Sequence, residues 1–346
     1  MTPAPRTRKQ GAFWGARRLD RAGVAAPRAE AEDLLAHVLS QPRHACYLEP
    51  DAPLTADETA RLRSLVARRA DGVPLQYLTG TETFRGLELE VTPDVLIPRP
   101  ETEGVVDAAL RVLADRRPAS PPAVVADIGT GSGCLALALA RVRPDVVVYA
   151  TDCSAAALAV AERNARRLGV ADRVTFLCGD LFEPLVRGGV RVDLVVSNPP
   201  YVADEHLPTL QIEVRHEPQS ALRGGVDGLH FYRRIVAEAG SVLAEGAGII
   251  VELGYGQADA VGALARGAGF DVARIDPDFQ RIPRVMTLAA PRPLIDAVEA
   301  PRSKLREIFE VQGGKGARFS CCSLTPQQAA GNTLAMHFQR ADGNRR

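Results

Sequence analysis

The stretch "VVADIGTGSGCLALALA", Val124 to Ala140, decides the fold predicted for the centre of this 346-residue chain. It begins with an apolar, β-branched run, passes through a turn that contains three glycines, and continues in residues that favour a helix. Glycine lets the backbone bend tightly and approach a ligand without a Cβ clash. The stretch therefore predicts a strand, a ligand-binding turn at Gly129, Gly131 and Gly133, and a helix in direct succession.

The same alternation of short β-branched runs and helical segments continues to residue 291. The expected strands are Val124–Ile128, Val146–Thr151, Val174–Cys178, Val192–Ser197, Gly248–Leu253, Phe270–Asp276 and Val285–Ala289. The expected helices are Cys134–Arg141, Ala155–Leu168, Phe231–Leu243 and Ala258–Ala268. Alternation of this kind predicts an α/β fold: a doubly wound, mostly parallel seven-stranded sheet with helices on both faces.

The residues before this region follow two other patterns. Apolar residues recur at helical spacing between Ala12 and Leu78, and Thr55 followed by Glu58 has the form of a capping box. The segment Thr81–Val91 then alternates apolar and polar residues, as a β-hairpin does. We therefore expect a disordered arm at 1–11, a small helical domain at 12–80, a β-hairpin linker at 81–100, the α/β domain at 101–291 and a disordered tail at 292–346.

Composition and charge narrow the class of protein. The chain carries 42 basic and 42 acidic residues and no net charge, which argues against a general nucleic-acid binder. Its six cysteines include no C-x-x-C pair and its six histidines show no metal-binding spacing, so we expect no metal and a reducing, cytoplasmic compartment. The first residues lack the apolar centre of a secretory signal, and no apolar run reaches the ~20 residues of a membrane span. We therefore expect no membrane association and no stable nucleic-acid binding.

Polar residues follow the first three predicted strands, at the edge where parallel sheets bind ligands. The G-x-G-x-G spacing of the turn differs from the G-x-G-x-x-G of dinucleotide-binding turns, and Asp127 just before it favours a cationic ligand over a pyrophosphate. Asp152 can accept both hydroxyl hydrogens of a ribose, which fits a nicotinamide or an adenosyl ligand equally well. After the third strand, Asp180 and the apolar Leu181 and Phe182 offer an edge for an adenine ring.

The fourth predicted strand ends in "SNPPY", Ser197 to Tyr201. Two successive prolines fix φ and remove two backbone donors, and Asn198 is restricted to extended conformations because a proline follows it. An –NH2 group at this strand tip can donate one hydrogen to the Asn198 side-chain oxygen and the other to the Pro199 carbonyl. The ring of Tyr201 can pack on the plane of the same group.

Two hydrogen-bond acceptors and an aromatic ring around an –NH2 group favour the alkylation of an amide nitrogen. This nitrogen is a poor nucleophile because its lone pair is delocalised into the carbonyl group. Hydrogen bonds that favour a pyramidal nitrogen localise the lone pair, and rigid placement against an electrophile supplies much of the remaining rate enhancement. If the electrophile is a methylsulfonium held over the glycine turn, the reaction is an in-line methyl transfer that requires no metal.

Taken in order along the chain, these motifs resemble those of class I S-adenosylmethionine-dependent methyltransferases. The sequence "NPPY", Asn198 to Tyr201, is the signature of members that methylate planar –NH2 groups in DNA, in rRNA and in protein glutamines. The stretch "VLIPRPETE", Val95 to Glu103, further resembles the peptide chain release factor glutamine N(5)-methyltransferases. This resemblance covers about residues 12–291.

The resemblance implies a role for each matching residue. The implied cofactor is S-adenosyl-L-methionine, and the implied substrate is the glutamine in the Gly-Gly-Gln motif of class I peptide chain release factors, which dock with the help of the helical domain. The implied cofactor-binding residues are Gly129, Thr130, Gly131, Ser132, Gly133, Asp152, Asp180, Leu181 and Asn198. The implied substrate-binding residues are Asn198, Pro199, Pro200 and Tyr201, of which Asn198, Pro199 and Tyr201 are catalytic, and Asp127, Arg99 and Glu101 support the site.

Other functions are weighed against this one. A DNA or RNA base methyltransferase requires a basic channel for the flipped base, which the zero net charge does not favour. A methyltransferase acting on a ribosomal-protein glutamine is closer, but "PRPETE" favours release factors. A non-catalytic binding module does not require the intact Asp152 and "NPPY", and an NAD enzyme does not fit the glycine spacing. We therefore expect a monomeric, cytoplasmic protein-glutamine methyltransferase.

Overall fold

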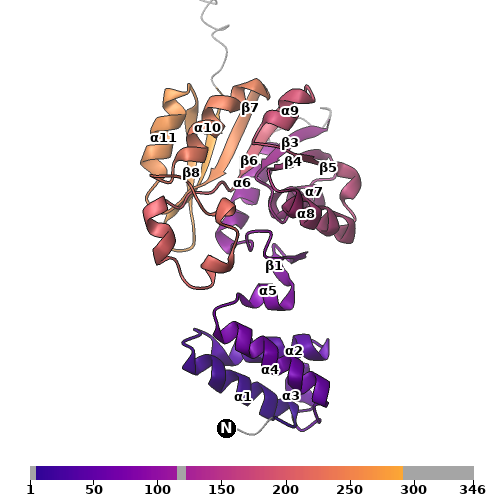
Figure 1. The fold of residues 1–346 in the computed structure, drawn as a ribbon. Coiled ribbons are helices and arrows are strands. Elements are labelled where there is room, and N and C mark those ends of the chain that lie inside the picture. The colour runs from indigo at the N-terminus through magenta and orange to yellow at the C-terminus, as the bar shows by residue number, and fades with distance from the viewer. Residues whose placement is uncertain (1–4, 115–121, 291–346) are drawn as a thin grey trace, which may run out of the picture. The chain divides into compact units, whose positions relative to one another are not determined.

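A computed structural model describes residues 5–114 and 122–290 of the chain (Figure 1). The disordered tail expected at 292–346 lies outside the described residues, as does the start of the expected arm at 1–4.

Within the part of the chain that the structure describes, seven strands form the central sheet. They are β3 (Ala123–Ile128), β4 (Val146–Asp152), β5 (Val174–Cys178), β6 (Val192–Ser197), β7 (Leu243–Glu252), β8 (Asp271–Pro277) and β9 (Pro283–Ala289). Their order across the sheet is β5-β4-β3-β6-β7-β9-β8. Strand β9 runs antiparallel to its neighbours β7 and β8, and the other neighbouring pairs are parallel. The prediction of a doubly wound, mostly parallel seven-stranded sheet is therefore confirmed.

Helices cover both faces of this sheet because its central strands are apolar on both sides. On one face lie α6 (Glu103–Ala114), α7 (Cys134–Val142) and α8 (Ala155–Leu168), and on the other α9 (Glu183–Arg187), α10 (His230–Glu238) and α11 (Ala258–Gly267). Neighbouring strand residues take opposite sides: in β3, Val125 packs with the first group of helices and Ala126 with the second. The sheet thereby separates two apolar cores.

Three parts of the α/β domain differ from the sequence expectation. The helix expected over Phe231–Leu243 ends at Glu238, and β7 begins at Leu243 instead of Gly248, because Leu243 pairs with Val192 of β6 and sheet pairing overrides the local helical pattern. Helix α6 was not expected, although Val105, Val106, Ala109 and Leu113 bury a helical stripe immediately after the proline-rich lead-in. The short helix α9 was not expected either.

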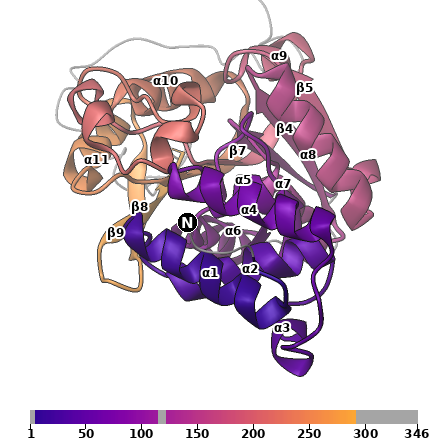
Figure 2. The same cartoon turned by 60° about the horizontal axis from the view of Figure 1, so that its bottom comes forward.

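The N-terminal helices form a core of their own (Figure 2). They are α1 (Arg8–Arg21), α2 (Pro27–Leu39), α3 (Ala45–Leu48), α4 (Ala56–Ala70) and α5 (Leu75–Thr79). The capping box predicted at Thr55 and Glu58 is confirmed at the start of α4. Helix α1 begins inside the arm expected to be disordered, because the Thr7 side chain caps its first turn and Gly11 is buried against Leu54 and Leu62.

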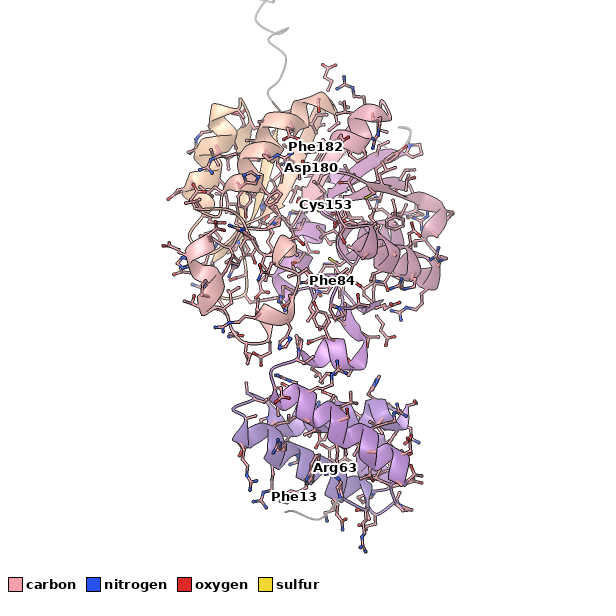
Figure 3. All side chains as sticks on the ribbon, in the orientation of Figure 1. Phe13, Arg63, Phe84, Cys153, Asp180 and Phe182 are labelled. Carbon is pink, nitrogen blue, oxygen red and sulfur yellow. The ribbon has the colours of Figure 1, made fainter. Side chains whose placement is uncertain are left out.

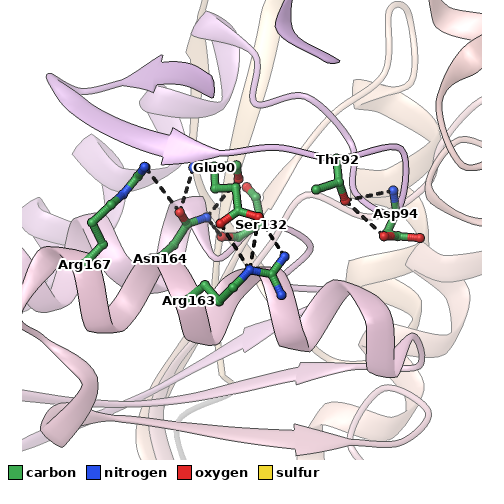
Figure 4. Close-up of polar contacts among 7 residues, drawn as sticks. All are labelled: Glu90, Thr92, Asp94, Ser132, Arg163, Asn164 and Arg167. Carbon is green, nitrogen blue, oxygen red and sulfur yellow. Dashed lines mark hydrogen bonds and ion pairs between the residues drawn. The ribbon is translucent and has the colours of Figure 1, made fainter. Parts of the chain in front are cut away.

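The predicted hairpin, β1 (Thr81–Phe84) and β2 (Leu87–Glu90), is fastened to α8 by a buried asparagine (Figure 4). The Asn164 side-chain oxygen accepts from the Glu90 backbone nitrogen at 2.7 Å, and its nitrogen donates to the Glu90 and Ser132 carbonyl oxygens, each at 3.0 Å. Arg163 adds an ion pair with the Glu90 carboxylate at 2.7 Å. Asn164 thus joins the hairpin to the glycine turn that precedes α7.

Replacing Asn164 by alanine is expected to lower the free energy of unfolding by roughly 3 kcal/mol, because three backbone groups lose their partners at a buried position. Chemical denaturation followed by circular dichroism measures this change. The matched control Arg163→Ala removes the half-exposed ion pair on the same glutamate and is expected to cost less than ~1 kcal/mol. A cost for Asn164→Ala no larger than that of the control would show that the hairpin does not depend on this contact.

Candidate active site

A cavity lies at the carboxyl ends of β3, β4, β5 and β6, where a parallel sheet binds ligands. Among its lining residues are eleven of the predicted site residues: Asp127, Gly129, Thr130, Gly131, Ser132, Asp152, Asp180, Leu181, Asn198, Pro199 and Pro200. Gly133, Tyr201, Arg99 and Glu101 are not among the lining residues. The fold therefore brings most of the predicted residues together around one space.

The three glycines of the turn have two different roles. Gly129 and Gly131 adopt φ of +74° and +56°, and a Cβ added to either would meet no atom within 4 Å, so their bare backbone faces the cavity. Gly133 adopts φ of +86°, but a Cβ there would lie 3.0 Å from a Leu137 methyl carbon and 3.2 Å from the Ala161 Cβ. Gly133 thus permits the close packing of α7 on α8, whereas the other two leave room for a ligand.

Asp127 is a buried carboxyl group in the wall of the cavity. Its Oδ2 accepts from the Thr130 hydroxyl at 2.7 Å and from the Ala136 backbone nitrogen at 3.1 Å. Its Oδ1 is buried and has no hydrogen-bond partner among the described residues. Burial raises the pKa of Asp127 to about 7, and the neighbouring Asp152 carboxylate adds to the rise. Such a group fits a ligand that brings a hydrogen-bond donor or a positive charge.

Asp152 ends β4 and shapes the turns on both sides of it. Its Oδ2 accepts from the Gly131 backbone nitrogen and its Oδ1 from the Ser154 backbone nitrogen, both at 2.9 Å. The N-cap of α8 is Ser154, whose hydroxyl accepts from Ala157, so Asp152 is not itself the helix cap. A carboxylate oxygen can accept more than one hydrogen bond, which leaves the predicted contact with a ribose open to Asp152.

The loop after β5 carries Asp180 and Phe182 (Figure 3), and its residues Asp180 and Leu181 line the cavity. Asp180 forms a bidentate ion pair with Arg234 of α10, in which the two guanidinium nitrogens donate to the two carboxylate oxygens at 3.0 and 2.8 Å. Leu181 adopts φ of +45°, and its carbonyl oxygen accepts from the Thr151 hydroxyl at 3.0 Å. Phe182, suggested by the sequence as part of the adenine edge, is instead buried in the core between the sheet and α10.

The strand tip at "NPPY" is tied to the glycine turn. The Ser197 hydroxyl donates to the Ile128 carbonyl oxygen at 2.7 Å, across the ends of β6 and β3. Pro199 and Pro200 line the cavity with Asn198, whereas the Tyr201 hydroxyl points to the Glu252 carboxylate at 3.4 Å. The Tyr201 carbonyl oxygen accepts from the Gln257 side chain at 3.0 Å.

Two residues behind Asn198 were missed from the sequence. The Asn198 side-chain nitrogen donates to the Thr102 hydroxyl at 3.1 Å, and that hydroxyl donates to the Glu252 carboxylate at 2.6 Å. Glu252 is buried, and burial raises its pKa to about 7. A charged residue at the end of the apolar run "GIIVE" is the signal from which Glu252 could have been found. Thr102 lies in "PRPETE", in which Arg99 and Glu101 were the expected site residues.

Arg99 and Glu101 do not contact the cavity. The Arg99 guanidinium pairs with the buried Glu217 carboxylate, which also accepts from the Ile97 backbone nitrogen at 3.1 Å. This pair joins the lead-in before α6 to the loop that follows "NPPY". Arg99 therefore holds two walls of the site together, and Glu101 lies close enough to Glu252 to raise the pKa of that carboxyl.

The described residues also limit the chemistry at the site. Within residues 5–114 and 122–290, no three His, Cys, Asp or Glu side chains gather as a metal ion would require. Burial raises the pKa of the Cys134 and Cys153 thiols in the cavity wall, so neither is activated as a nucleophile. No helix in the same residues is long and apolar enough to cross a membrane.

Comparison with known proteins gives the class first. Residues 102–225 match the family model described as the methyltransferase small domain, and residues 13–80 match the PrmC N-terminal domain. The chain is thus a methyltransferase, and its N-terminal helical domain is of the PrmC type.

The relatives then give the family. The chain is 49% identical over 249 residues to the release factor glutamine methyltransferase of Geobacter sulfurreducens, which covers 72% of this chain and 84% of the relative. It is 46% identical over 277 residues to the release factor glutamine methyltransferase of Moorella thermoacetica, and the matched region covers 79% of this chain and 95% of the relative. A solved structure of a release factor-specific protein-(glutamine-N5) methyltransferase from Alicyclobacillus acidocaldarius is 35% identical and covers 59% of this chain and 99% of its own, with a TM-score of 0.36. The chain belongs to the family of release factor glutamine methyltransferases.

The two raised carboxyl pKa values predict how the stability of the unliganded protein depends on pH. The folded protein keeps Asp127 and Glu252 protonated up to about pH 7, whereas an unfolded chain releases these protons near pH ~4. The folded state binds more protons in this window, so the free energy of unfolding falls as the pH rises from about 4 to about 7, by on the order of 1 kcal/mol per pH unit and group.

Denaturation curves recorded across this pH range measure how steeply the free energy of unfolding falls with pH. Asp127→Asn is expected to make this fall less steep. Glu252→Gln should do the same, because each variant deletes one of the two titrating groups. A slope that neither substitution changes would show that other groups govern the pH dependence.

Proposed function

We propose that this protein transfers a methyl group from S-adenosyl-L-methionine to the side-chain amide nitrogen of the glutamine in the Gly-Gly-Gln motif of class I peptide chain release factors. The observation that carries the proposal is the strand tip Asn198–Tyr201 beside the glycine turn, in a chain 49% identical over 249 residues to a release factor glutamine methyltransferase. The activity is that of a protein-glutamine N-methyltransferase in translation termination.

The cavity residues fit this cofactor. The unpartnered Asp127 Oδ1 suits the positive charge of the methionine part, and the bare backbone at Gly129 and Gly131, with Thr130 and Ser132, leaves space for it. Asp152 would accept from the ribose hydroxyls, and Leu181, beside Asp180, would contact the adenine. When bound, S-adenosyl-L-methionine supplies a methyl group on a positively charged sulfur, which is the electrophile of the reaction.

The substrate amide would be held at the strand tip. Because the Asn198 nitrogen already donates to Thr102, its side-chain oxygen remains as an acceptor for one N–H of the glutamine amide. The Pro199 carbonyl oxygen would accept the other N–H. Two acceptors placed in this way favour a pyramidal nitrogen and localise its lone pair. Pro200 keeps the turn rigid, so the amide is positioned without a loss of entropy at the moment of reaction.

Tyr201 contributes differently from Asn198 and Pro199. Its hydroxyl is directed to Glu252, which holds the ring in one orientation at the end of β6. Tyr201 is not among the residues that line the cavity, so packing of its ring on the plane of the amide stays an expectation for the complex with substrate. The partner of the reaction is a release factor, for which the helical domain at 12–80 would be the docking element, and we expect the enzyme to act as a monomer in the cytoplasm.

The proposed function is tested by transfer of a labelled methyl group from S-adenosyl-L-methionine to a purified class I release factor. A second copy of the release factor, with its Gly-Gly-Gln glutamine replaced, is the control. Label on the first copy alone is expected, and it identifies cofactor, substrate and residue together. Label on neither copy, although the protein binds the cofactor, would contradict the proposal and favour a ribosomal-protein glutamine or a nucleic-acid base as the substrate.

Asn198→Ala is expected to lower kcat by about 100-fold or more, because the variant loses an acceptor that acts mainly in the transition state. Cofactor affinity, measured by calorimetry, should change little, since several other residues line the cofactor part of the cavity. Near-normal turnover in the variant would contradict the role given to Asn198.

A further inference from the structure

The amide of Asn198 has two different ends, and the proposed reaction requires one of them. A glutamine –NH2 group needs an acceptor, so the Asn198 oxygen must face the substrate and its nitrogen must face away. Oxygen and nitrogen have nearly the same size, so shape alone does not choose between the two orientations. The choice depends on the hydrogen-bonding group that lies behind the side chain.

That group is the buried hydroxyl of Thr102. A hydroxyl has one hydrogen to donate, and Thr102 donates it to Glu252 Oε2 at 2.6 Å. The hydroxyl oxygen then has only lone pairs to offer to Asn198, and it accepts from the Asn198 nitrogen at 3.1 Å. An ionised Glu252 carboxylate cannot donate, so it determines the direction of both hydrogen bonds.

We propose, on the basis of the proposed function, that Thr102 and Glu252 are positioning residues, which hold the Asn198 amide with its oxygen toward the substrate while the Glu252 carboxylate is ionised. Glu252 is not among the residues that line the cavity, and the Thr102 hydroxyl, which is part of its wall, is already bonded to Asn198 and Glu252. They act through Asn198, by a chain of two hydrogen bonds whose direction the carboxylate sets.

The sheet brings the chain of residues together. Ser197 at the end of β6 pairs with Val251 of β7 in parallel register, so Asn198 and Glu252 are the next residues on two neighbouring strands. Thr102 ends the short 3₁₀ turn Pro100–Thr102 and lies within hydrogen-bond distance of both side chains. The lead-in before α6 thus supplies the hydroxyl that joins the two strand ends.

Charged and titratable groups meet Glu252 from several elements. The Tyr201 hydroxyl approaches Oε1 at 3.4 Å, and the Tyr232 hydroxyl of α10 donates to the Glu252 backbone carbonyl at 2.8 Å. Burial raises the pKa of Glu252 most, and Glu101 adds to the rise. The Thr102 hydroxyl and the positive charge of Arg284 on β9 oppose it. The balance leaves the pKa at about 7, so this carboxyl changes its charge near neutral pH.

When Glu252 is protonated, it no longer fixes which group donates and which accepts in the two hydrogen bonds from Asn198 through Thr102 to Glu252. A protonated carboxyl can donate to the Thr102 oxygen, and the Thr102 hydrogen is then free to turn toward Asn198. A hydroxyl that donates to Asn198 pairs with its oxygen, and the –NH2 end of Asn198 then faces the –NH2 of the substrate. The structure therefore predicts that kcat falls as the pH falls through about 7.

The test compares Thr102→Val, which keeps the shape but has no hydroxyl, with Thr102→Ser, which keeps the hydroxyl. With release factor and cofactor both saturating, Thr102→Val is expected to lower kcat about fivefold to tenfold, the loss of one orienting hydrogen bond. Thr102→Ser should stay within about twofold of the parent protein. Equal kcat for Thr102→Val and the parent protein, or no rescue by serine, would overturn the proposal.

The pH profile separates Glu252 from Asp127, whose pKa also lies at about 7. The parent protein should lose kcat on the acid side of about pH 7 at saturating cofactor, and Thr102→Val should lack this acid limb because Asn198 no longer senses Glu252. Asp127 acts on the cofactor, so an acid limb that persists in Thr102→Val would assign it to Asp127 and overturn the proposal.

A second readout does not depend on the methyl transfer. In protein labelled with ¹⁵N-asparagine, the side-chain amide signal of Asn198, assigned by its absence in Asn198→Ala, should shift with pH about a midpoint near 7. The shift should vanish in Thr102→Val, and Asn164, which bonds to backbone groups of β2 and the glycine turn, should show none. An Asn198 signal that does not titrate would overturn the proposal even if release factors are methylated. A titrating signal without methylation would support the hydrogen-bonded chain and reject the proposed function alone.

Discussion

The candidate site depends on the parallel pairing of β3 with β6. Asp127 and Val196 are partners in this register, so the glycine turn and "NPPY" leave the sheet at the same edge. The Ser197 hydroxyl closes the last gap between the two strands by donating to the Ile128 carbonyl oxygen at 2.7 Å. The expected binding sites for the cofactor and for the substrate amide therefore lie next to each other at this edge of the sheet. Methyl transfer between two molecules needs this arrangement, because both must be bound before the reacting atoms can align.

Buried carboxyl groups recur around this wall, and each one is partly compensated. Burying a charge is unfavourable unless hydrogen bonds or an opposite charge accompany it. Glu217 is matched by the Arg99 guanidinium and a backbone nitrogen, and it connects the proline-rich lead-in with the loop after "NPPY". Asp127 and Glu252 have hydrogen-bond donors but no salt bridge among the described residues, and their pKa values rise to about 7. The two carboxyl groups with the most strongly raised pKa values thus lie where the cofactor and the amide are expected to bind, a pattern typical of functional sites.

Much of the fold was predictable because its signals are local. Short β-branched runs identified the seven strands, helical spacing of apolar residues identified several of the helices, and the bounds of β5, β6 and α8 match the expectation. The glycine spacing and "NPPY" identified the two turns at the sheet edge. The end of α10 was misplaced because residues after Glu238 keep a helical pattern, and only the pairing of Leu243 with Val192 draws them into the sheet.

The sequence by itself determined which residues stand at the ends of β3, β4, β5 and β6, since strand length and turn chemistry are properties of neighbouring residues. Only the tertiary structure decided what lies behind them. Thr102 is 96 positions from Asn198, and Glu252 is 150 positions from Thr102, so no local pattern relates the three. Their hydrogen bonds exist because the sheet places two strand ends side by side and a proline-rich turn packs across them. The direction of an amide, unlike the position of a strand, depends on partners that only folding brings within reach.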